Sequence, residues 1–145
     1  MGPKTILFVC SFNSVRSQIA EAFINERCPS RYRAYSAGIA PAGLNPYAVA
    51  VMKEAGIDIS AHKAKKVGVF NGKKFDYVVT LCNRARLAGT GSLPCGENEI
   101  HHAFESPSEI RKNKAEILAD FRALRDEIRE WLDETFPDCA ERSRI

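Results

Sequence analysis

The chain of 145 residues has no apolar run long enough to span a membrane, and its first residues lack the pattern of a secretory signal. Its net charge of +3 is too small to indicate a nucleic-acid partner. Internal repeats, low-complexity tracts and linkers between domains are also missing. We therefore expect a single domain over residues 1–145 that acts in the cytoplasm, with neither a nucleic acid nor a membrane as its partner.

Cysteine is the residue type that needs an explanation. The chain contains five cysteines, and an odd number without a secretory signal argues against a framework of structural disulfides. Catalytic or redox use of some of them is the better interpretation. We expect Cys28 and Cys139 to be packing or surface residues.

The first informative motif lies near the N-terminus. The apolar run from Ile6 to Val9 predicts a strand buried on both faces of a parallel sheet, with Cys10 at its carboxyl end. A helical period begins at Ser14 or Arg16. The turn between strand and helix would point its backbone N–H groups, and the helix N-terminus, at an anion above Cys10.

This turn has the composition of an oxyanion site built around a thiolate. Arg16 offers a planar fork for two oxygens of a tetrahedral anion, and its charge favours the thiolate of Cys10. Ser14 and Ser17 are candidate hydrogen-bond donors to the sulfur, and Asn13 can hold the curl of the loop. A buried structural cysteine is the alternative, which the C-x5-R spacing followed by serine disfavours. The candidate oxyanion-binding residues are Ser11, Phe12, Asn13, Ser14, Val15, Arg16 and Ser17.

The remainder of the chain alternates between strand and helix patterns. We expect further strands over residues 32–36, 75–82 and 100–104, and helices over residues 46–56 and 108–137. This alternation predicts a three-layer α/β fold, a four-stranded parallel sheet with helices on both faces. Cys82 would then end a strand on the same edge of the sheet as Cys10.

Two polar stretches carry weaker signals. The basic residues 62–66 are interpreted as a solvated face. Residues 84–87 can form a short helical piece, and the glycine-rich residues 89–96, which include Cys95, are expected to be a flexible loop. His101 and His102 show no metal-ligand spacing with the cysteines, so we expect no metal.

Residues 10–22 resemble the active-site loop of the low-molecular-weight protein tyrosine phosphatase superfamily. Within them, residues 16–22 are closer to the thioredoxin-coupled arsenate reductases than to the phosphatases. Segments similar to those of the reductases also occur at residues 35–38, 45–46, 56–60 and 79–82. The resemblance therefore covers most of the chain and implies the low-molecular-weight phosphatase-like fold.

The resemblance also implies a reaction. Cys10 would attack arsenate while Arg16 and the loop N–H groups stabilise the oxyanion. Cys82 would then attack Cys10, forming a disulfide and releasing arsenite. No bound cofactor is expected, but an external thiol, from a thioredoxin or glutaredoxin system, is required as the reductant.

Three of the departures from these relatives concern the predicted site. The reductases carry a third cysteine where this chain has Gly89; Cys95 is the nearest substitute, or the relay involves only the first two cysteines. Glu105 stands where both groups carry a catalytic Asp-Pro, which makes it the candidate general acid, unless it merely helps to open the last helix. Phe12 replaces a usual glycine and suggests a more closed, apolar lip beside the pocket.

Two other functions remain open from the sequence. A low-molecular-weight phosphatase would hydrolyse a phosphoryl adduct of Cys10 and leave Cys82 idle. A non-catalytic oxyanion-binding or regulatory protein would keep the fold without the reaction.

Overall fold

The computed structural model describes residues 2–139, which form a four-stranded sheet with the strand order β2-β1-β3-β4. The strands are β1 (Lys4–Cys10), β2 (Tyr32–Gly38), β3 (Phe75–Thr80) and β4 (Gly96–His101). All three neighbouring pairs are parallel. The predicted parallel sheet is therefore confirmed.

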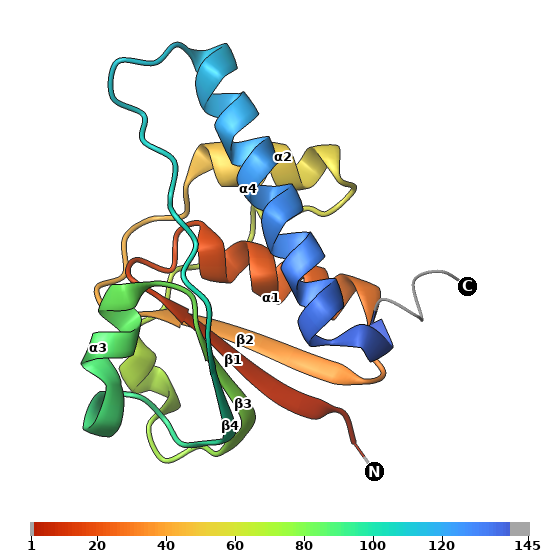
Figure 1. The fold of residues 1–145 in the computed structure, drawn as a ribbon, viewed down its shortest axis with the longest axis vertical. Helices are drawn as coiled ribbons and strands as arrows, with labels where there is room; N and C mark the ends of the chain where they lie inside the picture. The colour runs from red at the N-terminus through yellow and green to blue at the C-terminus, as the bar shows by residue number, and fades with distance from the viewer. Residues whose placement is uncertain (1, 140–145) are drawn as a thin grey trace.

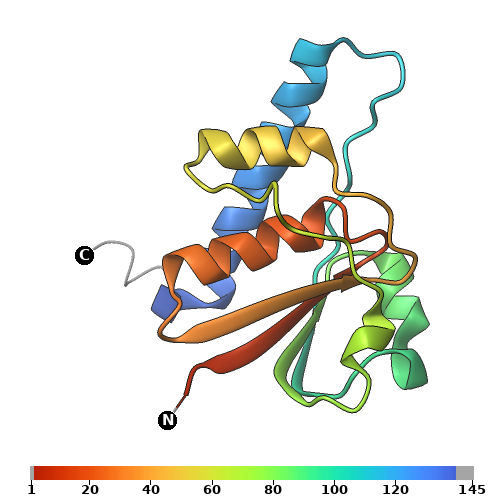
Figure 2. The ribbon, with the colours of Figure 1, turned by 180° about the vertical axis from the view of Figure 1, so that it is seen from behind.

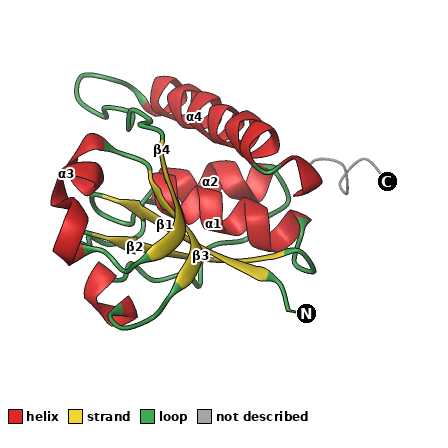
Figure 3. Ribbon diagram, turned by 60° about the horizontal axis from the view of Figure 1, so that its bottom comes forward, coloured by secondary structure: helices red, strands yellow, loops and turns green. Residues whose placement is uncertain are grey.

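Four α-helices surround the sheet. They are α1 (Arg16–Arg27), α2 (Pro46–Glu54), α3 (Asn83–Ser92) and α4 (Lys114–Thr135), and a short 3-10 helix, η1 (Val67–Phe70), precedes β3. The helices α1, α2 and α4 lie on one side of the sheet, whereas α3 lies on the other (Figures 1, 2 and 3). The three-layer α/β architecture with helices on both faces is thus confirmed.

The central strand β1 explains how the core is organised. The side chains from Ile6 to Cys10 are all buried, because β1 pairs with a strand on each edge and is covered on both faces. An uninterrupted apolar run is what such a position requires. On the covering helix α4, the buried face consists of Ile117, Phe121, Leu124, Ile128 and Leu132.

The ends of two elements differ from the prediction for physical reasons. Helix α4 begins at Lys114, about two turns later than expected, because Asn113 and Glu116 form a capping box at that point. Strand β4 begins at Gly96 rather than at residue 100. It is an edge strand whose first residues are polar and exposed, so it shows no apolar alternation.

The expected flexible loop over residues 89–96 is wrong in its first half. Helix α3 continues to Ser92, and β4 starts four residues later. Glycines inside a helix weaken its pattern in the sequence, which is why only its first turn was expected.

Cys28 and Cys139, expected to be packing or surface residues, are buried, but the expectation missed their covalent bond. They form a disulfide with a Cα–Cα distance of 5.3 Å, and it joins positions 111 residues apart. Cys28 is the C-cap of α1, and Cys139 lies just beyond the end of α4. Both are buried, and close by the rings of Tyr32 and Phe136 pack at 5.3 Å.

No helix among residues 2–139 combines the length and the apolar character that crossing a bilayer demands.

Replacing Cys139 by serine should lower the free energy of unfolding by about 2–4 kcal/mol, because the disulfide restricts the unfolded chain over a long loop. Urea denaturation under non-reducing conditions measures this difference, and Cys95→Ser, which removes an exposed free thiol, is the matched control. Equal midpoints for Cys139→Ser and the intact chain would contradict a stabilising crosslink.

Candidate active site

Strands β1 and β3 deliver two cysteines to the same edge of the sheet. Cys10 is the last residue of β1, and Cys82 follows β3 by two residues. The two strand ends are joined by a hydrogen bond of 2.8 Å from the Leu81 N–H to the Val9 carbonyl. Cys10 is 1% exposed and Cys82 is 5% exposed, so both thiols are covered by the elements around them.

A hydrogen-bond chain reaches the Cys10 sulfur. The Asn13 amide donates to Ser17 Oγ over 2.8 Å, which leaves the Ser17 hydroxyl hydrogen free to donate to Cys10 Sγ, 2.9 Å away. Of the two serines expected to contact the sulfur, Ser17 is brought to it. Ser14 instead accepts from the Asn45 N–H through its backbone carbonyl, at 3.1 Å.

Asn13 holds the curl of the loop. Its φ of 51° lies in the left-handed region, which asparagine tolerates better than most residues. Its side-chain oxygen accepts from the Lys65 N–H at 2.8 Å and from Gln18 Nε2 at 3.1 Å. The loop is therefore fixed from within by a fully buried side chain.

The backbone N–H groups of the loop are turned toward its interior. Three carbonyls of the loop accept hydrogen bonds from backbone N–H groups of the segment after β2. The pairs are Ile39 N–H to the Cys10 carbonyl (3.2 Å), Ala40 N–H to the Ser11 carbonyl (2.8 Å) and Ala42 N–H to the Phe12 carbonyl (2.9 Å). In a trans peptide the following N–H points to the opposite side. Val15, the N-cap of α1, contributes no side-chain hydrogen bond to the helix, so the first helical N–H groups also remain for an anion.

Arg16 completes this candidate anion site. Its Nη1 donates to the Phe104 carbonyl over 2.9 Å, which fixes the plane of the guanidinium. Its Nε is buried and has no hydrogen-bond partner among the described residues. Because a buried unpaired donor is costly, this N–H is best explained as reserved for a bound oxyanion.

The Cys82 sulfur lies where the loop meets α3. It accepts a hydrogen bond of 3.3 Å from the Ala85 N–H in the first turn of α3, and it is 3.2 Å from Ser11 Oγ. Close by, Arg84 of the same turn lies over the ring of Phe12, with its guanidinium carbon 5.7 Å from the ring centre. The Phe12 side chain is 45% exposed and therefore forms part of the rim.

Cys95 is not brought to this site. It lies at the amino ends of β3 and β4, where its carbonyl accepts from the Phe75 N–H at 3.1 Å. With a rise of about 3.3 Å per residue, the backbone from residue 75 to residue 82 spans roughly 20 Å. The structure thus separates Cys95 from Cys82 by the length of β3.

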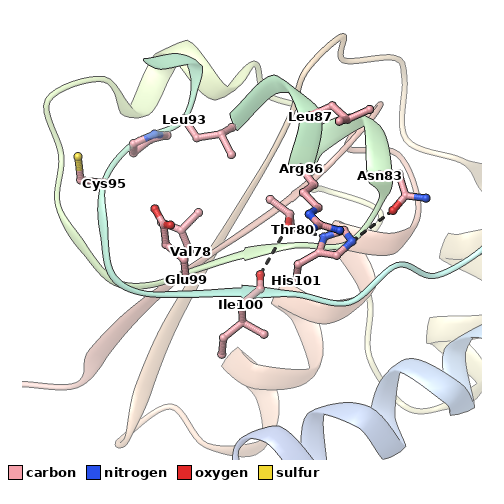
Figure 4. A pocket seen from close by; sticks show the side chains of 11 residues that line it. Val78, Thr80, Asn83, Arg86, Leu87, Leu93, Cys95, Glu99, Ile100 and His101 are labelled. Carbon is pink, nitrogen blue, oxygen red and sulfur yellow. Dashed lines mark hydrogen bonds between the residues drawn. The ribbon is translucent and has the colours of Figure 1, made fainter. Parts of the chain in front are cut away.

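A cavity of about 990 Å³ lies between α3 and the strands β3 and β4, and both Cys95 and Asn83 line it. Figure 4 shows Cys95 at one end of this cavity and Asn83, the neighbour of Cys82, at the other. Near Asn83, the His101 ring bridges Thr80 Oγ1 at 2.7 Å and Asn83 Oδ1 at 3.3 Å. Burial and the nearby Arg86 lower the pKa of His101, which favours the neutral ring.

The backbone of Glu105 lies next to the candidate anion site. It directly follows Phe104, whose carbonyl is bound to Arg16, and its side chain is exposed. Among the described residues, no three His, Cys, Asp or Glu side chains gather where they could hold a metal ion.

Sequence reasoning missed the part that His62 and Gln18 play in a polar network behind the loop. Glu21 accepts from Ser36 Oγ at 3.1 Å and lies 3.4 Å from His62 Nδ1, which is also 3.1 Å from Gln18 Oε1. Burial raises the pKa of Glu21, and the charges of Lys65 and His62 oppose this rise. The interpretation of residues 62–66 as a solvated face is therefore wrong at His62, and no periodic signal in so irregular a segment could have shown it.

Taken together, a thiol at the start of the loop, N–H groups along it and an arginine at its end define a thiol-dependent enzyme for tetrahedral oxyanions. Residues 5–135 match the family model described as low molecular weight phosphotyrosine protein phosphatase. The chain belongs to this family.

Two of the curated relatives are named arsenate reductase. An arsenate reductase of Halalkalibacterium halodurans is 39% identical over 128 residues, covering 88% of this chain and 91% of that protein. An arsenate reductase of Bacillus licheniformis is 39% identical over 130 residues, covering 90% of this chain and 93% of the relative.

Solved structures agree with the fold. "An arsenate reductase in the phosphate binding state" superposes with a TM-score of 0.74 at 30% identity, covering 97% of this chain and 99% of the other. "An arsenate reductase in oxidized state" gives a TM-score of 0.78 at 27% identity, covering 94% and 98%. The fold is shared with a low molecular weight protein tyrosine phosphatase from T. tengcongensis, at 23% identity and a TM-score of 0.75. The superposition covers 93% of this chain and 99% of the phosphatase.

Gly38→Ala should weaken oxyanion binding, because the added Cβ would lie 2.8 Å from the Asn13 nitrogen and 2.9 Å from the Phe12 carbonyl carbon. Relieving such overpacking costs about 1–3 kcal/mol, so we expect phosphate affinity to fall roughly tenfold or more. Calorimetric titration with phosphate measures it. Gly43→Ala, where nothing lies within 4 Å of the added Cβ, is the control and should bind as the intact chain does. Unchanged phosphate affinity in both variants would show that the loop shifts to accept the added Cβ without a cost in binding, which would contradict the prediction.

The raised pKa of Glu21 predicts a pH-dependent stability. The folded state holds the Glu21 proton more tightly than the unfolded state, so the chain should lose stability as pH rises above the ordinary value of 4.5. Because glutamine does not titrate, the stability of the intact chain relative to Glu21→Gln should fall over this range. Urea denaturation at pH values between about 4 and 8 tests this. Glu26→Gln, on the exposed side of α1, should show no such trend; a constant difference for Glu21→Gln would refute the assignment.

Proposed function

We propose that this protein reduces arsenate to arsenite, with Cys10 as the nucleophile and Cys82 as the second cysteine of a disulfide relay. The observation that carries the proposal is the position of Cys82, whose sulfur lies 3.2 Å from the hydroxyl of Ser11, the residue next to Cys10. A phosphatase has no use for a second buried thiol at this place. The relatives named arsenate reductase support the same conclusion.

The first step is a displacement at arsenic. The loop N–H groups and the free Nε of Arg16 bind the arsenate oxygens and stabilise the charge that develops as the Cys10 thiolate attacks. A sulfur–arsenic bond forms, and one oxygen leaves after receiving a proton. Glu105, which follows the carbonyl that holds Arg16, is the proposed donor of that proton.

The second step is the reduction itself. The Cys82 thiolate attacks the sulfur of Cys10, and the electron pair of the sulfur–arsenic bond passes to arsenic. Arsenic is thereby reduced from the pentavalent to the trivalent state, arsenite leaves, and a Cys10–Cys82 disulfide remains. Phosphorus does not accept electrons in this way, so a bound phosphate would stop at the first step or be hydrolysed.

The last step needs two further electrons from an external thiol. One thiolate attacks the disulfide and a second thiol releases the mixed disulfide, which restores Cys10 and Cys82. Because Cys95 lies roughly 20 Å from Cys82 along β3, we propose that the reductant acts on the Cys10–Cys82 disulfide directly. A thioredoxin or glutaredoxin system is the proposed donor. Free catalytic thiols also require a reducing compartment, so we propose the cytoplasm as the location.

Cys82→Ser should abolish arsenate reduction while leaving phosphate binding intact, because serine cannot form the disulfide. The assay is arsenate-dependent NADPH oxidation with thioredoxin and its reductase, and again with glutathione, glutaredoxin and glutathione reductase. Cys95→Ser is the control and should retain turnover; loss of turnover in this variant would place Cys95 in the relay.

The same variants separate the other two functions. Hydrolysis of an aryl phosphate that is unaffected by Cys82→Ser, together with no arsenate turnover, would identify a phosphatase. Phosphate binding without either activity would identify a non-catalytic oxyanion-binding protein.

A further inference from the structure

Three aromatic rings pack behind the arginine of the anion site. Phe104 and His102 follow β4, and Trp131 belongs to α4. The Trp131 ring meets Phe104 edge-on at 5.8 Å and stacks on His102 at 5.0 Å, while His102 and Phe104 are 4.7 Å apart. We call these three residues the aromatic clamp. The proposed reaction steps use none of these three side chains.

Phe104 is the member of the clamp that reaches the site. Its N–H donates to the Leu81 carbonyl at 2.9 Å, and Leu81 precedes Cys82. Its own carbonyl accepts from Arg16 Nη1 at 2.9 Å, and Glu105 is the next residue along the chain. One buried residue therefore links the backbone beside the second thiol, the anion-binding arginine and the candidate acid.

The segment that carries Phe104 is held on two sides. On the sheet side, the His102 N–H donates to the Thr80 carbonyl at 3.0 Å, in addition to the bond from Phe104 to Leu81. On the helix side, the rings of His102 and Phe104 are covered by Trp131. Residues 102–113 contain no helix or strand, so Trp131 supplies the packing that regular structure supplies elsewhere.

We propose that Trp131 is a positioning residue for the anion site, acting through Phe104 on Arg16 and Glu105. The contact fixes the Phe104 carbonyl, the carbonyl fixes one nitrogen of the guanidinium, and the buried Nε is thereby held ready before the oxyanion arrives. Without Trp131, Arg16 would have to be ordered by the ligand. The proposal rests on the proposed function only in taking a tetrahedral oxyanion as the ligand of Arg16.

The same link makes Trp131 a reporter of the site. It is the only tryptophan in the chain. Occupation of Arg16 by an anion should alter the clamp and change the fluorescence of Trp131. We expect inorganic phosphate to change this fluorescence along a saturation curve with the same midpoint as calorimetric titration of the intact protein. Binding heat without any fluorescence change would overturn the proposal.

Substitutions at Trp131 give the decisive test. Trp131→Ala should lower phosphate affinity and kcat/KM for arsenate by roughly 10- to 100-fold, the loss expected when groups of the site are misplaced by up to about 1 Å. Trp131→Phe, which keeps an aromatic ring against Phe104 and His102, should restore most of both. If Trp131→Ala does not fold, Trp131→Leu keeps the apolar bulk without the ring and should show the same loss.

Leu118→Ala is the matched control for packing. Leu118 is another half-buried apolar residue of α4 that packs against the core without belonging to the clamp. It should lose stability on truncation but retain phosphate affinity. Equal effects of Leu118→Ala and Trp131→Ala on affinity would mean that Trp131 is merely structural, which would overturn the proposal.

Phosphate binding keeps this inference separate from the proposed function. If the variants change phosphate affinity as expected but the intact protein does not reduce arsenate, the positioning role stands and the reductase is refuted. If arsenate is reduced equally well by the intact protein and by Trp131→Ala, the reductase stands and the positioning role is refuted.

Discussion

The left-handed turn at Asn13 is the constraint on which the rest of the site depends. One buried amide fixes the turn, orients Ser17 toward the Cys10 sulfur and binds both Gln18 and the backbone of Lys65. Because the side chain satisfies several groups at once, the loop can keep its N–H groups free for a ligand without collapsing on itself. The strained conformation is supported by the structure around it rather than by the loop alone.

A parallel sheet explains why chemistry from four separate segments meets above Cys10. The carboxyl ends of β1, β3 and β4 share one edge, so the loops that follow them supply Cys10, Cys82 and the Phe104–Glu105 segment. The segment after β2 closes the fourth side by taking up the loop carbonyls. The helix α1 then turns its uncapped N-terminus toward the same point.

Much of this arrangement could be predicted because it depends on short-range patterns. The apolar run before Cys10 and the alternation of strands and helices each leave a local signal, and the structure has both. The misses depend on contacts between distant segments. The pairing of Cys28 with Cys139, the contact of His62 with Glu21 and the distance of Cys95 from Cys82 all follow from the tertiary fold. No local pattern contains that information.

With the Cys28–Cys139 bond, the chain has one structural disulfide beside the Cys10–Cys82 disulfide that forms in the proposed cycle. In the proposed cycle, a thiol donor must reduce the bond between Cys10 and Cys82 at every turnover while leaving the bond between α1 and α4 intact. The second bond lies beneath the surface, with Cys28 0% and Cys139 3% exposed, so attack on it requires the chain to open first. Selectivity between the two bonds is therefore a matter of kinetics: the working disulfide belongs to a site that must admit ligands, whereas the other is sequestered until the protein unfolds.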